Sequence, residues 1–397
     1  MKTMIKNTFV GIAALLFISS CMEDDLMQVL PVDEDNLIVN DNSYDLNLRL
    51  SQKQDTIGIL TAHSRGRIAR DFTLVLTEEI ASPVVNGETL MASSLDLKNS
   101  LIAATYNLQG EPYLGAVDLM TLSGDKLKLT SQLIIQNGDV NAAYFDNSKL
   151  YFVGAAEGSD STSFVGSADV VKNSIQTENM LFRRLGGHTA TGLIQKDNFV
   201  YVTTGNNEST GGGLHVLNET DLSTSSYFPL RDARWVDIAD ENVFVQQAMP
   251  GNLWVKQLKN NFSSNEISFD GLNTPHAKST FEISGDLIFV AAGYSGVQII
   301  NLKSGTIVGE VPLPSGPTSD DKVCNAVSVD GDLIFISNGE HIAVATFDKK
   351  DPINPNPEIL GTLDLGNHQS VNHIRYRSNR LLIAGGLGGI KVIRVYR

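Results

Sequence analysis

Polar side chains recur at matching positions along this chain, with a spacing that could bring them to one binding site. Four of them carry amide or guanidinium groups, namely Asn141, Arg234, Asn325 and Asn372. Three histidines lie a few residues before such positions, namely His188, His276 and His368. These groups are typical of sites that bind a sugar, a peptide or another polar ligand. The alternative is that the amides satisfy backbone groups and face a water-filled channel. At the level of sequence both interpretations stay open.

A metal-dependent or classical catalytic site is the less favoured interpretation of these residues. Three histidines could hold a catalytic metal, but these belong to alternate repeats and no carboxylate at ligand spacing accompanies them. We therefore expect no metal and no cofactor. The chain also has no His-Glu-x-x-His, no Gly-x-Ser-x-Gly, no P-loop and no dinucleotide fingerprint. Enzymatic activity stays open, because a catalytic site can also be assembled from scattered residues.

An internal repeat sets the spacing of the polar residues. Near-copies of one short motif of three or four apolar residues, such as LIFV, begin at positions 150, 199, 243, 287, 333 and 381. A weaker copy begins at 101. The intervals are 44 to 49 residues, and a β-rich period of about 40 to 50 residues is typical of propeller blades. The sequence therefore predicts an all-β fold, a seven-bladed β-propeller.

Each repeat can be divided into four strands, of which the first lines the central channel. In the fifth repeat the expected strands are 279–283, 287–292, 297–302 and 306–313. The last repeat ends before its fourth strand, whereas the apolar stretch Phe72–Thr77 precedes the first repeat without a partner. We predict that this N-terminal strand completes the last blade and so removes an open β-edge. Trp235 and His373 should then lie one residue into the first strands, just inside the channel mouth.

The N-terminus has the pattern of a secretory signal. Lys2 and Lys6 precede an apolar run over residues 9–18, which is too short to span a membrane. The segment that ends at Cys21 resembles the lipobox of bacterial lipoproteins, and the acidic residues 23–25 resemble a surface-export signal of Bacteroidota. The resemblance implies a signal peptide over 1–20 and a lipidated Cys21. We expect an acidic tether over 21–45 and the propeller over 46–397, with blades from about 72.

The sequence of the repeats resembles that of the LVIVD-repeat β-propellers found in surface proteins of Bacteroidota. The resemblance is carried by residues 292–301 (AGYSGVQIIN) and 385–393 (GGLGGIKVI), and it covers most of 72–397. It implies the fold and a secreted or surface location. That family has no single activity, so it implies no ligand.

Charge and cysteine content narrow the possible partners. The full chain has a net charge of −15, and removal of residues 1–20 takes away two lysines and no acid, which leaves −17. A surface this acidic disfavours nonspecific binding to nucleic acid or to phospholipid headgroups. We therefore expect no nucleic-acid partner, and contact with the membrane only through the lipid anchor. Cys324 has no second cysteine in the mature domain with which to form a disulfide.

These observations lead to one favoured function and two alternatives. The favoured one is non-catalytic capture of a ligand, such as a glycan or a corrinoid, at the channel mouth of a lipoprotein on the outer face of the outer membrane. An outer-membrane transporter is the protein partner that this function suggests. The alternatives are a polysaccharide lyase or glycosidase at the same mouth, and a scaffold subunit of an envelope complex. Thr56, in the triplet Asp55-Thr56-Ile57, resembles an O-glycosylation sequon.

Overall fold

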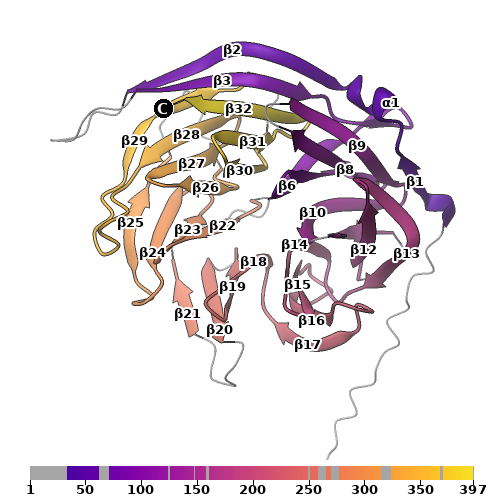
Figure 1. Ribbon diagram of the computed structural model, residues 1–397. Coiled ribbons are helices and arrows are strands. Elements are labelled where there is room, and N and C mark those ends of the chain that lie inside the picture. Colours follow the sequence, from indigo (N-terminus) through magenta and orange to yellow (C-terminus); the bar gives the residue numbers. More distant parts are fainter. Residues whose placement is uncertain are drawn as a thin grey trace, which may run out of the picture.

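The computed structural model arranges seven β-sheets as blades around a central channel, and this confirms the predicted fold class (Figure 1). It describes residues 34–396 apart from 62–70, 124–125, 147, 158–160, 249–250, 258–264, 270–276, 314–322 and 367–369. Cys21, His276 and His368 therefore lie outside the described residues.

The first four blades follow one another along the chain, and each consists of antiparallel neighbours in sequence order. Blade 1 contains β6 (Met91–Lys98), β7 (Leu101–Asn107), β8 (Gly115–Ser123) and β9 (Lys126–Ile135). Blade 2 contains β10 (Gly138–Asp146), β11 (Lys149–Ala156), β12 (Ser163–Val171) and β13 (Ser174–Arg184). Blade 3 contains β14 (Thr189–Lys196), β15 (Phe199–Gly205), β16 (Gly213–Asn218) and β17 (Thr224–Pro229). Blade 4 contains β18 (Ala233–Ala239), β19 (Asn242–Gln247), β20 (Asn252–Gln257) and β21 (Asn265–Ser268).

The remaining blades bring the chain back to its start. Blade 5 contains β22 (Phe281–Ser284), β23 (Leu287–Ala291), β24 (Val297–Asn301) and β25 (Ile307–Val311). Blade 6 contains β26 (Val327–Asp330), β27 (Leu333–Asn338), β28 (His341–Thr346) and β29 (Glu358–Asp364). Blade 7 takes three strands from the C-terminus, namely β30 (His373–Arg377), β31 (Arg380–Ala384) and β32 (Ile390–Tyr396).

An N-terminal strand closes the ring, as the sequence predicts. β3 (Asp71–Ile80) pairs antiparallel with β32, with Leu74 opposite Val395 and Leu76 opposite Ile393. The outer edge of β3 is in turn covered by β2 (Leu50–Thr61), so blade 7 has five strands (Figure 1). Leu74 is 1% exposed and packs among the residues between blades 6 and 7. The closure therefore buries apolar side chains as well as pairing backbone groups.

Part of the segment expected as a tether belongs to the fold. After the short 3-10 helix η1 (Glu34–Asn36), β1 (Leu37–Asn40) pairs with β9 as a fifth strand on blade 1. The helix α1 (Ser43–Asn47) follows, and the side chain of Asn42 caps it by accepting from the amides of Tyr44 and Asp45. Leu37 and Val39 both point to the core next to blade 2, while Ile38 between them is exposed. This alternation is that of a strand with one buried face. The only other paired segments are β4 (Val84–Val85) and β5 (Glu88–Thr89), which form a small hairpin in the described chain.

The core consists of apolar layers between neighbouring blades. The second strand of each blade lies between two other blades, and β23 and β27 are buried over their whole length. Between blades 6 and 7, Phe335 and Tyr376 stack with ring centroids 4.9 Å apart. Cys324 is buried and free, and burial raises the pKa of its thiol, so it behaves as a small apolar residue.

Candidate functional site at the channel mouth

A ring of hydrogen bonds joins the blades at the start of their first strands. At six of the seven blade boundaries, a polar side chain donates to a backbone carbonyl of the next blade, at 2.8 to 3.2 Å. The acceptor is each time the carbonyl just before the corresponding residue of that blade. The six donors, which we call the clasp residues, are Ser93, Asn141, Thr191, Arg234, Asn325 and Asn372.

A β-bulge directs four of these side chains toward the neighbouring blade. The pairing of the first and second strands skips one residue at Ser93, Asn141, Thr191 and Arg234. A bulged residue is left out of the ladder, and its side chain is turned away from the direction that regular alternation would give it. The clasp is thus a local consequence of strand irregularity that recurs from blade to blade.

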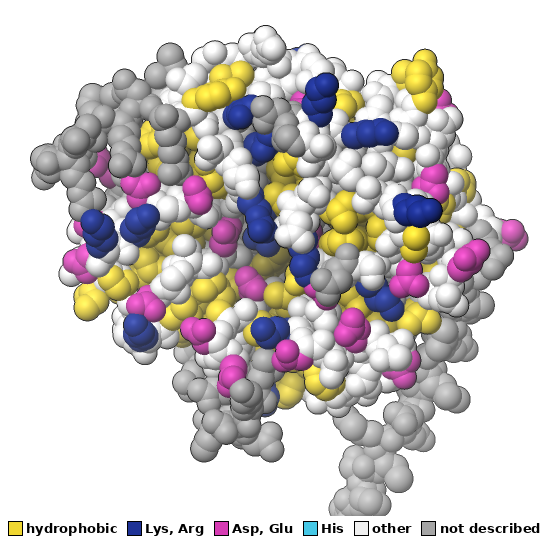
Figure 2. All heavy atoms as spheres, viewed as in Figure 1, with side chains coloured by type: hydrophobic (Ala, Val, Ile, Leu, Met, Phe, Trp, Pro, Cys, Tyr) yellow, Lys and Arg dark blue, Asp and Glu magenta, His cyan; other side chains and the backbone are white. Residues whose placement is uncertain are grey.

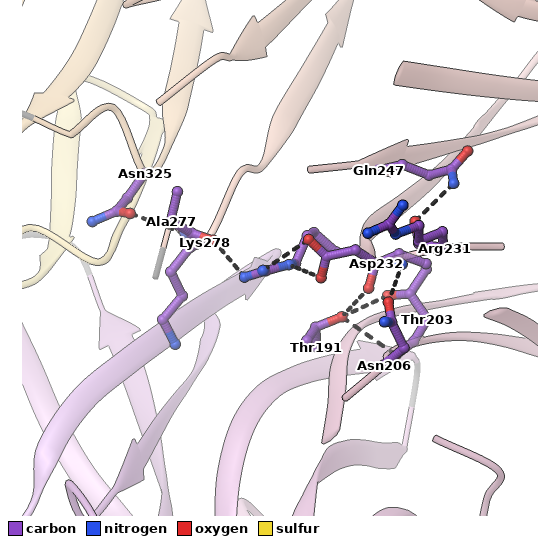
Figure 3. A network of polar contacts seen from close by, with 11 residues as sticks. Thr191, Thr203, Asn206, Arg231, Asp232, Gln247, Ala277, Lys278 and Asn325 are labelled. Atoms are coloured by element: carbon purple, nitrogen blue, oxygen red, sulfur yellow. Dashed lines mark hydrogen bonds and ion pairs between the residues drawn. The ribbon is translucent and has the colours of Figure 1, made fainter. Parts of the chain in front are cut away.

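The four predicted amide and guanidinium residues all belong to this ring. Asn141 accepts from Asn107 at 2.8 Å and donates to Thr189 Oγ1 at 2.9 Å, so both ends of its amide are used. Arg234 holds the carboxylate of Asp232 with two bonds of 2.7 and 2.9 Å (Figure 3). The structural interpretation of these residues therefore has direct support. Asn141 and Arg234 also line the cavity described below, so contact with a ligand stays a prediction for them.

Blade 5 is the exception in the ring, because it has one residue more at this point. In each first strand, the residue paired third from the hairpin turn faces the channel. In blade 7 this residue is Arg375, which comes three positions after the clasp residue Asn372. In blade 5 the same position is Glu282, four residues after Lys278. The extra residue, Ser279, has a positive φ of 53°. The backbone N–H of Lys278 donates to Asn325 Oδ1 at 2.9 Å, and its side chain is left out of the ring.

A cavity of about 190 Å³ opens at this level. Its polar wall combines clasp residues, hydroxyl side chains and Lys278. The lining residues are Ser93, Ser94, Asn141, Thr189, Thr191, Arg234, Trp235, Ala277, Lys278, Thr280 and His373.

Two aromatic rings meet across the channel next to the clasp ring. Trp235 comes from blade 4 and His373 from blade 7, and their ring centroids are 5.3 Å apart. His373 Nδ1 accepts from the amide of Leu95 at 3.3 Å, and burial, together with Arg375 and Lys278, holds the pKa of His373 well below its usual range. The imidazole is therefore neutral. A Cβ on Gly192 would lie 3.1 Å from Trp235, so this glycine leaves room for the indole. The two rings form the floor of the cavity.

Lys278 is the one lining side chain with a charge that no described residue pairs. Its amino group has no hydrogen bond or ion pair within the described residues, and in Figure 3 its side chain points away from the network around Asp232. Burial lowers the pKa of Lys278 to about 8, against the opposing effect of Asp139, and Arg234 lowers it further. Burial also raises the pKa of Asp139 to about 7, although its Oδ1 accepts from the amides of Leu108 and Leu114.

A second polar layer lies deeper in the channel, beyond the aromatic floor. Arg375 Nη1 is 3.7 Å from Glu282 Oε2, and Asp96 and Asp237 contribute further negative charge around it. Burial raises the pKa of all three carboxyl groups, while Arg375 lowers it. These residues occupy the same position in their first strands, since each is paired third from the hairpin turn. Sequence reasoning missed this layer, although alignment of the first strands contained the signal.

The other predicted residues lie apart from the cavity or outside the described chain. His188 Nδ1 lies 3.2 Å from Asn207 Nδ2 in a loop, and His188 does not line the cavity. Thr56 is exposed on β2, at the rim of blade 7, where its modification stays a prediction. No group of three metal-ligating side chains comes together within the described residues.

Comparisons with known proteins show the fold. No family model matches the chain, and no curated protein matches it. Among solved structures it is similar to U3-55K, with a TM-score of 0.58 and 11% identity over 79% of this chain and 98% of that one. It is also similar to the WD40 repeats of RRP9, with a TM-score of 0.58 and 11% identity over 87% of this chain and 100% of that one. The propeller domain of Doa1 gives a TM-score of 0.52 at 11% identity, over 86% and 97% of the two chains.

The chain is accordingly a seven-bladed β-propeller, a fold compatible with binding a ligand or a partner. The finer resemblance to LVIVD-repeat proteins stays an expectation from the sequence. Among the described residues, no helix has the length and apolar character needed to cross a bilayer.

Proposed function

We propose that this protein is a binding protein whose ligand enters the mouth of the channel and stops at the ring pair Trp235 and His373. The observation that carries the proposal is the cavity of about 190 Å³ with polar groups that the fold does not use. Ser94 Oγ and Thr280 Oγ1 are buried there without a hydrogen-bond partner in the described part of the chain. Since buried polar groups are normally satisfied, a ligand or ordered water is expected to supply the partners.

The size of the cavity limits what can enter it. A water molecule takes about 30 Å³ of liquid volume, so the cavity has room for a ligand of a few heavy atoms or for one end of a larger ligand. A glycan or a corrinoid would insert a terminal group and rest its remainder on the surrounding loops. No carboxylate lines the cavity among its described residues. This supports binding over glycoside hydrolysis, which uses a pair of carboxyl groups.

A ligand screen followed by two readouts tests this proposal. We expect at least one compound from a panel of monosaccharides, short organic acids, simple amides and corrinoids to raise the melting temperature. A ligand present at 100 times its Kd adds about 2.7 kcal/mol to the free energy of unfolding. The same compound should change the fluorescence of Trp235 at the cavity floor. Trp235→Phe should remove that change and keep the signal of buried Trp254. A ligand that raises the melting temperature but leaves the fluorescence of Trp235 unchanged would show that the site lies elsewhere.

We further propose that Cys21 carries the lipid anchor and that the propeller is displayed on the outer face of the outer membrane. The support is the basic and apolar N-terminus followed by Cys21 and acidic residues. Acyl chains add about 0.8 kcal/mol of membrane affinity per buried methylene, so several chains anchor a protein stably.

The anchor is tested by Cys21→Ser. Because the variant cannot be acylated, we expect it to leave the outer-membrane fraction, whereas the parent protein stays there and is digested by protease added to intact cells. A Cys21→Ser protein that still fractionates with the outer membrane would contradict the anchor.

A further inference from the structure

We propose that the mouth cavity binds the carboxylate group of a small organic acid, or of a larger ligand, through the amino group of Lys278. This inference rests on the proposed binding function and names the chemical class that the cavity selects. It goes beyond the predicted residues, which did not include Lys278 among the site candidates.

All of the uncommitted groups in the cavity wall can donate a hydrogen bond. Lys278 offers three N–H groups, and Ser94 and Thr280 offer hydroxyls without partners in the described chain. Thr189 Oγ1 already accepts from Asn141, which leaves its own O–H to donate. A wall rich in free donors fits a ligand that only accepts, and an ionised carboxylate has this property.

The acceptors near the cavity are occupied by the protein itself. Asn141 Oδ1 accepts from Asn107, and the Asp232 carboxylate is held by both edges of Arg234. Arg234 is thus neutralised by its neighbour, whereas among the described residues only Asp139 opposes the positive charge of Lys278. A bound carboxylate would supply the missing counter-charge.

The extra residue in blade 5 explains why the charge is available. Each clasp residue uses its side chain to hold the next blade. At the boundary of blade 5, where Ser279 is inserted, the backbone N–H groups of Lys278 and Thr280 donate to Asn325 instead, at 2.9 and 3.0 Å. The Lys278 side chain is therefore released from a structural role. Space-filling atoms in Figure 2 show Lys and Arg side chains at the centre of the face in view, on a molecule of net negative charge. A local positive site on an acidic protein can steer a small anion to the centre.

Titration of wild-type and variant proteins with acetate tests the inference, and acetamide serves as the neutral analogue. We expect acetate to change Trp235 fluorescence and acetamide to bind at least tenfold more weakly. Lys278→Met should weaken acetate binding at least tenfold, whereas Lys278→Arg should retain most of it. Lys303→Met, a change on the same blade at a side chain that is 77% exposed, is the matched control and should bind acetate like the wild type. Melting curves check folding, and Lys278→Met should be at least as stable as wild type because it removes a poorly solvated charge.

The pH dependence of acetate binding supplies an independent readout. The charged and titratable groups around Lys278 are Asp139, Arg234 with Asp232, and neutral His373 in the described chain. Acetate affinity should fall as the pH rises through about 8, where Lys278 loses its proton, and Lys278→Arg should remove this fall.

The outcomes separate this inference from the function on which it rests. Equal acetate affinity in wild type and Lys278→Met, or equal binding of acetate and acetamide, overturns the role of Lys278 as an anion site. If acetamide or a sugar binds with a Trp235 response while acetate does not, the binding function stands and the carboxylate class is wrong. If none of the panel binds at the mouth, both proposals fail.

Discussion

Arg234→Ala should lower the free energy of unfolding by about 3–5 kcal/mol, which is the range for breaking a buried ion pair by removing one partner. The guanidinium makes two bonds to Asp232 and a third, of 2.8 Å, to the carbonyl of Ala277 in the next blade. Its removal leaves the Asp232 carboxylate, in a residue that is 7% exposed, without its counter-charge. The loss is measured by urea denaturation, with the slope monitored for two-state behaviour.

Three further variants show whether the clasp causes the loss. Arg231→Ala removes an exposed arginine from the same loop and should change stability by less than about 0.5 kcal/mol. Asn372→Ala removes a single neutral clasp to the carbonyl of Ala92 and should cost about 1–3 kcal/mol. Combining Arg234→Ala with Asp232→Ala should recover part of the loss, because no unpaired charge then remains. If Arg234→Ala instead leaves stability unchanged and only weakens ligand binding, the ring is a binding device rather than a clasp.

Arg375→Met should destabilise the protein by about 2–3 kcal/mol at pH 8, mainly by leaving Asp96, Asp237 and Glu282 without their cation. The cost is smaller than for a fully dry ion pair because the Arg375 side chain is 33% exposed to the channel. Arg377→Met, on the exposed end of the same strand, is the matched control.

The effect of Arg375→Met should depend on pH in a defined direction. The pKa values of the three carboxyls are raised by burial, and loss of Arg375 raises them further. A carboxyl with a raised folded-state pKa binds its proton more tightly in the folded chain, so its stabilising effect is present at low pH and is lost as pH rises through that pKa. The deficit relative to wild type should therefore shrink toward about pH 4, near the unfolded-state pKa of Asp and Glu. A deficit that is constant from pH 4 to 8 would show that Arg375 acts by packing alone.

The predicted site residues illustrate how far a repeat alignment reaches. Asn141, Arg234, Asn325 and Asn372 do occupy one structural level, as their shared position in the repeat indicated. Their role could not be decided from the alignment, because a clasp is made with a carbonyl far away in the chain, 43 to 49 residues for the first three and 280 residues for Asn372. The sequence alone therefore left both a ligand contact and a structural bond open.

Ser93 and the deeper charged layer show the opposite case. Ser93 lies in the weakest copy of the repeat, so its correspondence to Asn141 is visible only in the structure, where both residues are skipped in the pairing with the second strand. Asp96, Asp237, Glu282 and Arg375 lie in the regularly paired ends of their first strands, each third from the hairpin turn. Their convergence follows from the ring closure, because only a closed ring directs the first strand of every blade to one axis.

The sequence by itself determined the number of blades and the closing strand, because both depend on local periodicity and on a count of strands at the two ends. Phe72–Thr77 was expected to pair with another strand, since an apolar strand with open edges is unfavourable in water. Only the tertiary structure decided which polar side chains bond to other parts of the protein and which are left to face the cavity. Arg234 is held by Asp232 and Ala277, whereas one extra residue in blade 5 frees Lys278 to face the cavity. That difference depends on which backbone groups of the next blade each side chain meets, and no pattern of residue types contains this.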